Sequence, residues 1–338
     1  MTFEPLVTVI IPTYNRADKV GDAIESVLAQ SYSNIQIIVI DDGSEDHTSE
    51  LMSFYPQIEY ISQNHAGQAA ARNNGLKNAK GSIIANLDSD DIWESEFLSN
   101  CVIKLERDGL DFVFANWTQE NKHGEDHDFM LGDPVLQPFF TRTKNDWINL
   151  ENNDLRKLYL NACPSPSSSV VLRKSSIVSG WDEEISIGDD WALYLEMILS
   201  KECRVAFTLK KLWKKRIDEI NIYDGRVRSE VLRLLYINDL NRVIERHTSI
   251  LTDEEMKILK HMQMLSLVEL SKHKMIREFE IIQSLKLFKR SCAINILFSL
   301  KAIPIIIFRG FLNKKKGFLL KKEQYKYATK PMPEGITI

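Results

Sequence analysis

Residues 6–16 read LVTVIIPTYNR, and this stretch decides the fold. Its first six residues form a continuous, mostly β-branched run that Pro12 closes. A second run, IQIIVI at residues 35–40, is closed by Asp41, Asp42 and Gly43. Runs without polar alternation are typical of parallel strands that are buried on both faces. The sequence therefore predicts two central parallel strands.

The segment between these strands has a helical pattern. Val20, Ile24, Val27 and Leu28 recur at helical spacing, which predicts a helix over about residues 17–30 and hence a βαβ unit. The alternation continues with a helix at 48–55, a strand at 58–61, a helix at 66–79 and a strand at 82–87. This order predicts an α/β fold with a Rossmann-like, mostly parallel sheet and flanking helices. Such sheets bind ligands at the carboxyl ends of their strands.

The alternation weakens after about residue 108. We predict strands at 110–115, 167–172 and 204–208 and a helix at 191–199, and residues 118–151 show little periodicity. Long irregular stretches in compact enzymes usually shape substrate sites. From residue 225 the pattern is helical, so we expect a catalytic domain over residues 1–224 and a helical region over residues 225–338.

Composition excludes several classes of protein. The chain has 338 residues, of which 44% are hydrophobic and 27% charged, so it is neither disordered nor a multispan membrane protein. Its 43 Lys and Arg face 47 Asp and Glu, and this net charge of -4 gives no sign of nucleic-acid binding. Between residues 286 and 330, however, twelve basic residues accompany one acid, Glu323. This basic tail, residues 286–330, and the acidic remainder of the chain should therefore bind different partners.

Cysteine spacing and the N-terminus indicate a cytosolic protein. Cys101, Cys163, Cys203 and Cys292 lie far apart, so neither a zinc site nor a disulfide framework is indicated. The apolar run at residues 7–11 is too short for a signal peptide. We therefore expect a cytoplasmic protein.

Acidic clusters follow the predicted strands. Asp41 and Asp42 follow one strand, and Asp88, Asp90 and Asp91 follow the strand at residues 82–87. Carboxylates that converge on one sheet edge repel each other unless a cation or a hydrogen-bonded ligand is present. Asp88 and Asp90 are spaced to share Mg²⁺ or Mn²⁺ and a ribose, because these cations prefer oxygen ligands and substrate phosphates. The alternative is a solvated acidic turn.

The spacing of Arg72 and of the Asp189–Asp190 pair does not by itself decide between a functional and a structural role. Arg72 lies on the helix predicted after the strand at 58–61, where it would bind a base or a phosphate at the acidic edge. The alternative is an arginine on a helix surface. Asp189 and Asp190 begin a predicted helix, and their spacing alone is equally explained by helix capping.

The motifs together resemble those of family 2 glycosyltransferases with the GT-A fold. The resemblance covers about 210 residues, with its elements in the family's order and spacing. The matching residues are VIIPTYNR at 9–16, VIDDGS at 39–44, Gly67, ARNNG at 71–75, NLDSDD at 86–91, SVVLRK at 169–174, GWDE at 180–183 and DDW at 189–191.

The resemblance implies an inverting transferase that moves a sugar from a nucleoside diphosphate sugar, with Mg²⁺ or Mn²⁺, to a glycan or lipid-linked acceptor. Such a reaction suits the assembly of a bacterial surface polysaccharide. Two rival classes stay open. One is a relative that binds nucleotide or carbohydrate without catalysis, and the other is a nucleotidyltransferase, which releases pyrophosphate instead of a nucleoside diphosphate.

The resemblance also implies roles for single residues. Asp190 takes the place of the family's general base, beside Asp189 where many members have Glu. Asp218 stands where many members have His. In the donor site that the resemblance implies, Tyr14 lies near the base, Asp42 with Asp41 bonds to the pyrimidine edge, and Arg72 contacts the base or a phosphate. Asp88 binds the ribose and Asp90 binds the cation. The further donor-binding residues expected from the same motifs are Pro12, Arg16, Gly67 and Ser89.

The basic tail contains an apolar segment at residues 293–312, which Pro304 interrupts. It is marginal as a membrane-spanning helix and is more typical of an amphipathic element that lies on anionic lipid. The alternative is a helix that packs on the catalytic domain. We therefore expect the tail to bring the protein to the inner face of the cell membrane.

Overall fold

The computed structural model describes residues 4–120, 126–216 and 226–302. The chain divides into two compact units, residues 1–184 with 189–217 and residues 185–188 with 218–338. The domain boundary expected at residue 224 lies in the gap at 217–225, outside the described residues.

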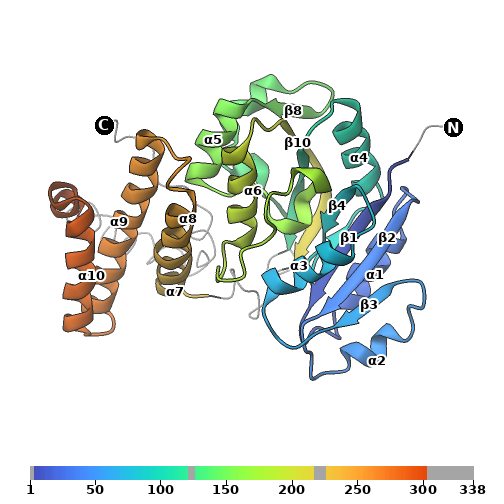
Figure 1. Ribbon diagram of the computed structural model, residues 1–338, viewed down its shortest axis with the longest axis horizontal. Helices are drawn as coiled ribbons and strands as arrows, with labels where there is room; N and C mark the ends of the chain where they lie inside the picture. Colours follow the sequence, from blue (N-terminus) through green and yellow to red (C-terminus); the bar gives the residue numbers. More distant parts are fainter. Residues whose placement is uncertain (1–3, 121–125, 217–225, 303–338) are drawn as a thin grey trace. The chain divides into compact units, whose positions relative to one another are not determined.

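The first unit is built around a ten-stranded sheet flanked by helices (Figure 1). The order of its main path is β3-β2-β1-β4-β9-β6-β10-β5, while β7 pairs with β6 and β8 pairs with β10. The strands are β1 (Val7–Thr13), β2 (Ile35–Asp41), β3 (Glu59–Ser62), β4 (Ile83–Asn86), β5 (Ile92–Trp93), β6 (Phe112–Glu120), β7 (Asp126–Asp128), β8 (Trp147–Leu150), β9 (Val170–Arg173) and β10 (Val205–Arg216).

The pairing confirms the predicted α/β fold with a mostly parallel sheet. β1 pairs in parallel with β2 and β4, and β2 pairs in parallel with β3. β9 is antiparallel to both β4 and β6. Because β1, β2 and β4 run in one direction, their carboxyl ends meet at one edge of the sheet.

Pro12 does not close the first strand, contrary to the sequence-based expectation. β1 continues to Thr13, and Pro12 pairs in parallel with Ile40 of β2. The pairing of β1 with β4 ends at Ile10, so the chain beyond that point has a strand partner on one side only. A proline fits there because the missing N–H would have no ladder partner on the open side.

Helices of the first unit connect these strands. They are α1 (Val20–Leu28), α2 (Thr48–Met52), α3 (Gln68–Asn78), α4 (Phe97–Arg107), α5 (Asn152–Asn161) and α6 (Asp189–Ser200). α3 packs closely on β1, because a Cβ atom at Gly75 would lie 2.4 Å from a methyl carbon of Ile10.

Residues 118–151 contain more regular structure than the sequence predicted. They include β7, two 3₁₀ segments at Met130–Gly132 and Gln137–Arg142, and β8, which is antiparallel to β10. β10 itself reaches Arg216, well past the strand expected at 204–208. Pairing with a neighbouring strand therefore extends order into a stretch that lacks periodicity.

In the residues described from 226 to 302, the second unit consists of helices joined by short turns. Its elements are α7 (Arg228–Arg233), a π-helical turn (Leu234–Asp239), α8 (Leu240–His247), α9 (Asp253–Ile276) and α10 (Ile281–Ile294). A cluster of Leu232, Ile237, Leu267 and Leu270 forms its core. Within the described ranges, no helix is long and apolar enough to cross a membrane.

Candidate active site

Arg72 is the centre of the candidate site. Its position on α3, one turn before Gly75, places the guanidinium at the carboxyl edge of the sheet, where only 1% of the side chain is exposed. One terminal nitrogen lies 2.7 Å from a carboxylate oxygen of Asp88, and the other lies 2.5 Å from Asp189 and 3.4 Å from Asp190. The helix-surface alternative for Arg72 is therefore wrong.

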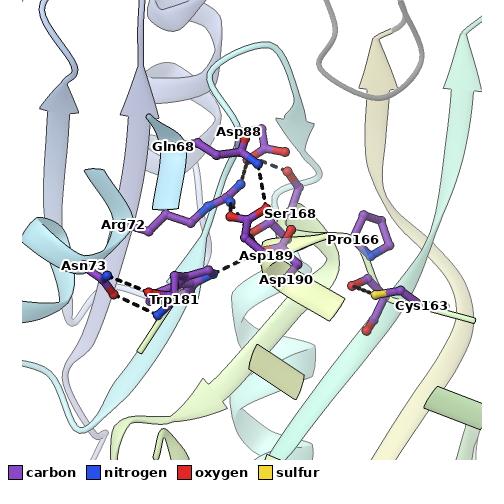
Figure 2. A network of polar contacts seen from close by, with 12 residues as sticks. Gln68, Arg72, Asn73, Asp88, Cys163, Pro166, Ser168, Trp181, Asp189 and Asp190 are labelled. Carbon is purple, nitrogen blue, oxygen red and sulfur yellow. Dashed lines mark hydrogen bonds and ion pairs between the residues drawn. The ribbon is translucent and has the colours of Figure 1, made fainter. Parts of the chain in front are cut away.

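Figure 2 shows this arrangement, with Arg72 pointing toward Asp88 and the Asp189–Asp190 pair. One buried cation faces three carboxylates that come from the end of β4 and the start of α6. Burial raises the pKa of Asp189 to about 7 and also raises that of Asp190, and the Arg72 guanidinium opposes both shifts. This is a suitable place for a positively charged ligand or a phosphate-bound cation.

The two acids of α6 differ in what they can do. Asp189 is buried, and its two oxygens accept hydrogen bonds from Gln68 and Arg72. The side chain of Asp190 is 19% exposed, and its Oδ1 accepts from Ser167 Oγ and Trp181 Nε1, both at 3.1 Å. None of the described residues donates to Oδ2 of Asp190. Asp190 therefore has a carboxylate oxygen available to a substrate, whereas Asp189 orients Arg72.

Trp181 is held in place by a second set of bonds. Its backbone N–H donates to Asn73 Oδ1 at 2.9 Å, and its carbonyl accepts from Asn73 Nδ2 at 2.8 Å. Gly180, next to it, has a φ of +84°, and a Cβ atom there would lie 2.6 Å from Asn73 Oδ1. Only glycine permits this close approach, which aims the Trp181 indole at Asp190.

The acidic turn after β4 is tied to the same edge. Ser168 Oγ donates to Asp91 at 2.6 Å and accepts from the backbone N–H of Asp88 at 3.0 Å. Arg16 lies 3.4 Å from Asp90, and Ser89 is buried in the same turn. Burial, reinforced by Asp88, raises the pKa of Asp90, and burial with the neighbouring acids raises that of Asp91 well above its usual value.

The expected metal ligands fit a divalent cation in their chemistry. Asp88 is 37% exposed, and its second oxygen has no partner among the described residues. In the described ranges, no group of three or more His, Cys, Asp or Glu side chains is arranged as a metal site. Mg²⁺ is usually bound by one or two carboxylates together with substrate phosphates, which is what Asp88 and Asp90 offer.

The two acids at the end of β2 bond to neighbouring loops. Asp42 accepts hydrogen bonds from Gln63 Nε2, from Ala66 N and, at 2.7 Å, from Gly67 N. Asp41 accepts from Ser44 N and from Tyr60 Oη at 2.6 Å. Both acids are buried, and in this structure the Asp42 carboxylate positions the loop at residues 63–67, whereas the Asp41 carboxylate holds Ser44 and Tyr60.

Tyr14 is the exposed aromatic residue at this edge. Its ring is 43% exposed and stacks on His65, with ring centroids 4.3 Å apart. Pro12 is buried within β1, and Gly67, with a φ of +95°, immediately precedes α3. Most residues predicted for the donor site thus lie at or just beyond the carboxyl ends of β1, β2 and β4, while Gly67 precedes α3 and Arg72 lies on it. Asp218 falls outside the described residues.

Sequence reasoning assigned no role to several side chains that support the acids of this site. Ser167 and Trp181 bond to Asp190, Ser168 bonds to Asp91, and Gln68 bonds to Asp189. Trp181 and Asn73 lie in the matching motifs at 180–183 and 71–75, and the serines form a run immediately before an apolar strand, so the sequence carried signals for them without indicating their contacts.

Comparison with known structures identifies the fold class. A mannosyltransferase from Pyrobaculum calidifontis, solved with GDP-mannose and Mn²⁺, has a TM-score of 0.57 at 17% identity and covers 97% of this chain and 86% of its own. TarS from Staphylococcus aureus, residues 1–349 with UDP-GlcNAc, has a TM-score of 0.54 at 18% identity, with 85% and 90% covered. The fold is therefore that of the GT-A glycosyltransferases.

Sequence comparison gives a family match for the first part of the chain. Residues 8–167, somewhat less than half of the chain, match the model described as "Glycosyl transferase family 2", so this part of the chain is similar to the domain of that family. WfaP of Escherichia coli, a UDP-Glc:alpha-D-GlcNAc-diphosphoundecaprenol beta-1,3-glucosyltransferase, is 41% identical over 115 residues, or 33% of this chain and 46% of that protein. The chain spans between 20% and 66% of the length of the curated relatives compared.

Proposed function

We propose that this protein is an inverting glycosyltransferase. Its donor is a nucleoside diphosphate sugar, with UDP as the leading candidate, and its acceptor is a hydroxyl of a lipid-linked or glycan substrate in surface-polysaccharide assembly. The family match and the UDP-sugar and diphosphoundecaprenol in the name of WfaP support this choice.

One observation carries the proposal. Asp190 lies beside Arg72 with one carboxylate oxygen bonded to Ser167 and Trp181 and the other available. A sugar hydroxyl is a poor nucleophile, so a carboxylate must accept its proton as the new bond forms. Ser167 and Trp181 fix the orientation of that carboxylate before the substrate arrives.

The reaction follows from these positions. The acceptor oxygen bonds to the anomeric carbon while the bond from that carbon to the diphosphate oxygen breaks, and Asp190 takes the hydroxyl proton. Displacement from the opposite side inverts the anomeric centre. Arg72 holds Asp189 and Asp88 in place at the site. A positioned base of this kind is typically worth about 10²- to 10⁴-fold in rate.

Asp90 and Asp88 would hold the divalent cation. When bound, Mg²⁺ or Mn²⁺ supplies Lewis-acid stabilisation of the departing diphosphate. Arg16, 3.4 Å from Asp90, holds that carboxylate at the sheet edge. Tyr14 offers an exposed ring for the base, and Asp41 and Asp42 order the loop beside it.

A donor screen tests this function. Purified protein is melted with nucleoside diphosphate sugars and Mn²⁺, because a ligand that binds only the folded state raises the melting temperature. Donors that bind are then incubated with acceptors, and the released product is identified. Release of the nucleoside diphosphate supports the proposal, release of pyrophosphate indicates a nucleotidyltransferase, and binding without turnover on any acceptor indicates a silent relative.

A cytoplasmic location remains part of the proposal. The tail segment expected to contact lipid, residues 293–312, lies outside the described residues from 303 onward. A lipid-linked acceptor would nevertheless require the enzyme to work close to a membrane.

A further inference from the structure

Helices α9 and α10 of the second unit pack against each other. α9 and α10 lie side by side (Figure 1). Serines are among the residues at their contact. Ser284 bonds to Ser271, and Ser291 bonds to the carbonyl of Met264, with all three serine side chains buried. The same face of α10 also contributes Leu287 and Ile294, which pack against the core cluster that contains Leu267 and Leu270 of α9. The inner face of α10 is therefore filled, and its other large apolar side chains need a separate explanation.

The large apolar side chains gather where α9 turns into α10. We call this cluster the α9–α10 tip. Its members, with their exposed fractions, are Met275 at 45%, Ile276 at 55%, Phe279 at 81%, Ile281 at 61%, Ile282 at 70% and Leu285 at 57%. Isolated exposed apolar residues are common, but six within eleven positions form a patch that needs a partner.

Phe279 is the most exposed member, and its backbone is strained. Its φ is +57°, a conformation that bulky residues rarely adopt. Among the described residues, nothing packs on this ring to offset the strain of its backbone. The strain is explained if the ring has a binding partner beyond the described residues.

Charge at the tip favours an anionic partner. Lys286, Lys289 and Arg290 are exposed on α10, and none has an ion-pair partner among the described residues. The nearby acids Glu278 and Glu280 are both paired with Lys274. From residue 281 to residue 302 the sequence contains four basic residues and no acid.

We propose that the α9–α10 tip docks on an anionic lipid surface, with Phe279 and its apolar neighbours in the interface and the basic residues of α10 on the headgroups. α10 has 14 residues, so it is about 21 Å long and too short to cross a hydrocarbon core of about 30 Å. Apolar side chains next to basic ones are the pattern of helices that lie in the membrane plane. The proposal does not depend on the transferase function, because lipid binding is measured without donor or acceptor.

Vesicle flotation of the full chain tests the proposal. Intact protein should float with vesicles that contain phosphatidylglycerol and stay behind with pure phosphatidylcholine. Phe279→Asn should lower the partition coefficient about tenfold or more, because a buried aromatic ring is lost. Asparagine tolerates a positive φ, so this variant should melt no lower than the intact protein and loss of binding cannot be attributed to unfolding.

Two further variants sharpen the result. Phe54→Asn is the matched control, because Phe54 is 77% exposed in the first unit, and it should bind vesicles like the intact protein. Lys286→Gln with Lys289→Gln should also reduce binding about tenfold and should weaken its dependence on salt.

Three outcomes overturn the proposal. The intact chain fails to bind anionic vesicles, or Phe279→Asn binds them as well as the intact chain does, which would assign binding to another part of the chain. Alternatively, light scattering shows that Phe279→Asn dissociates an oligomer while lipid binding is absent, which would assign the tip to a second copy.

Discussion

At the scale of single residues, the site depends on one buried arginine. Arg72 is 1% exposed and contacts Asp88, Asp189 and Asp190. Buried carboxylates without a counter-ion are strongly unfavourable, so Arg72 has a structural as well as a functional effect. The Nε atom of Arg72 is buried without a partner among the described residues. The hydrogen bonds that orient the Arg72 side chain are therefore those from its terminal nitrogens to the acids.

Replacement of Arg72 should therefore destabilise the first unit. Arg72→Met keeps much of the side-chain volume but leaves the carboxylates unpaired, and it should lower the free energy of unfolding by about 3 to 5 kcal/mol. Arg107→Met is the matched control, because Arg107 pairs with Asp108 at the surface and should leave stability unchanged. Urea denaturation followed by circular dichroism measures both variants. Equal stability of the two would show that the arginine network is not structural.

The activity should fall in acid at an unusually high pH. Burial raises the pKa of Asp190, although Arg72 opposes the shift. A proton acceptor must be ionised, so kcat/KM should decrease as the pH falls through this raised pKa, above the value of about 3.9 for an ordinary aspartate. A rate profile from pH 4 to 8 measures it. A rate that stays constant down to pH 4 would exclude Asp190 as a base with a raised pKa.

Sequence reasoning recovered the charged residues of the site but not their supports. Arg72, Asp88 and Asp190 belong to motifs with strong chemical character, and the structure brings them together. Ser167 and Trp181 bond to Asp190 from positions 23 and 9 residues away. Serine and tryptophan are ordinary core residues by type, so only the tertiary structure reveals their contribution.

At the scale of elements, α3 is positioned by a glycine. A Cβ atom at Gly75 would lie 2.4 Å from Ile10, so α3 approaches β1 more closely than alanine allows. Gly75→Ala should push α3 outward and lower the free energy of unfolding by about 1 to 3 kcal/mol, despite the better helix propensity of alanine. Turnover should fall as well, because Arg72 lies one turn earlier on the same helix.

Gly21→Ala in α1 is the control for this prediction. A Cβ atom there meets only Tyr55 at 3.4 Å and Leu51 at 3.7 Å, which are ordinary contacts. Alanine at this position should leave the melting temperature unchanged or raise it slightly. A Gly75→Ala protein as stable as Gly21→Ala would refute the close packing of α3 on β1.

Within the second unit, Asp239 holds a loop by three hydrogen bonds. Its carboxylate accepts from the backbone N–H groups of Ser186, Ile187 and Gly188 at 2.9 to 3.0 Å, and the side chain is buried. Asp239→Ala should leave these donors unsatisfied and lower stability by about 1 to 3 kcal/mol. Asp253→Ala, at the exposed start of α9, is a control with a smaller expected effect. Thermal unfolding compares them, and equal melting temperatures would contradict the role of Asp239.

The strands that the sequence predicted well are those with a continuous apolar run. β1 and β2 are buried along almost their entire length, so their composition alone indicated them. β5 has only two residues, and β8 lies in an aromatic stretch. Both strands form by antiparallel pairing with β10, which is distant in sequence. Such elements are determined by their partner strand and cannot be inferred from local sequence. α4 has buried Phe97, Cys101 and Leu105 at helical spacing, a pattern that the sequence displays although no helix was predicted there.

At the scale of the whole molecule, the fold joins residues that are far apart in the chain. Arg72 and Asp189 are separated by 117 positions, and the order of the sheet brings β4 and β9 together although β5 to β8 lie between them in sequence. The uneven charge, with a basic segment from residue 286 onward, suits a protein whose two parts have different partners. The catalytic proposal concerns the first unit and the lipid proposal concerns the second.

The central claim is that Asp190 removes the acceptor proton at a donor site that forms independently of it. The most direct test compares Asp190→Asn with the intact chain in two measurements, the rise in melting temperature caused by the donor and the rate of nucleoside diphosphate release with acceptor. We predict that the rise in melting temperature persists and that turnover falls by about 10²-fold or more. Turnover within a few-fold of the intact protein would contradict the claim.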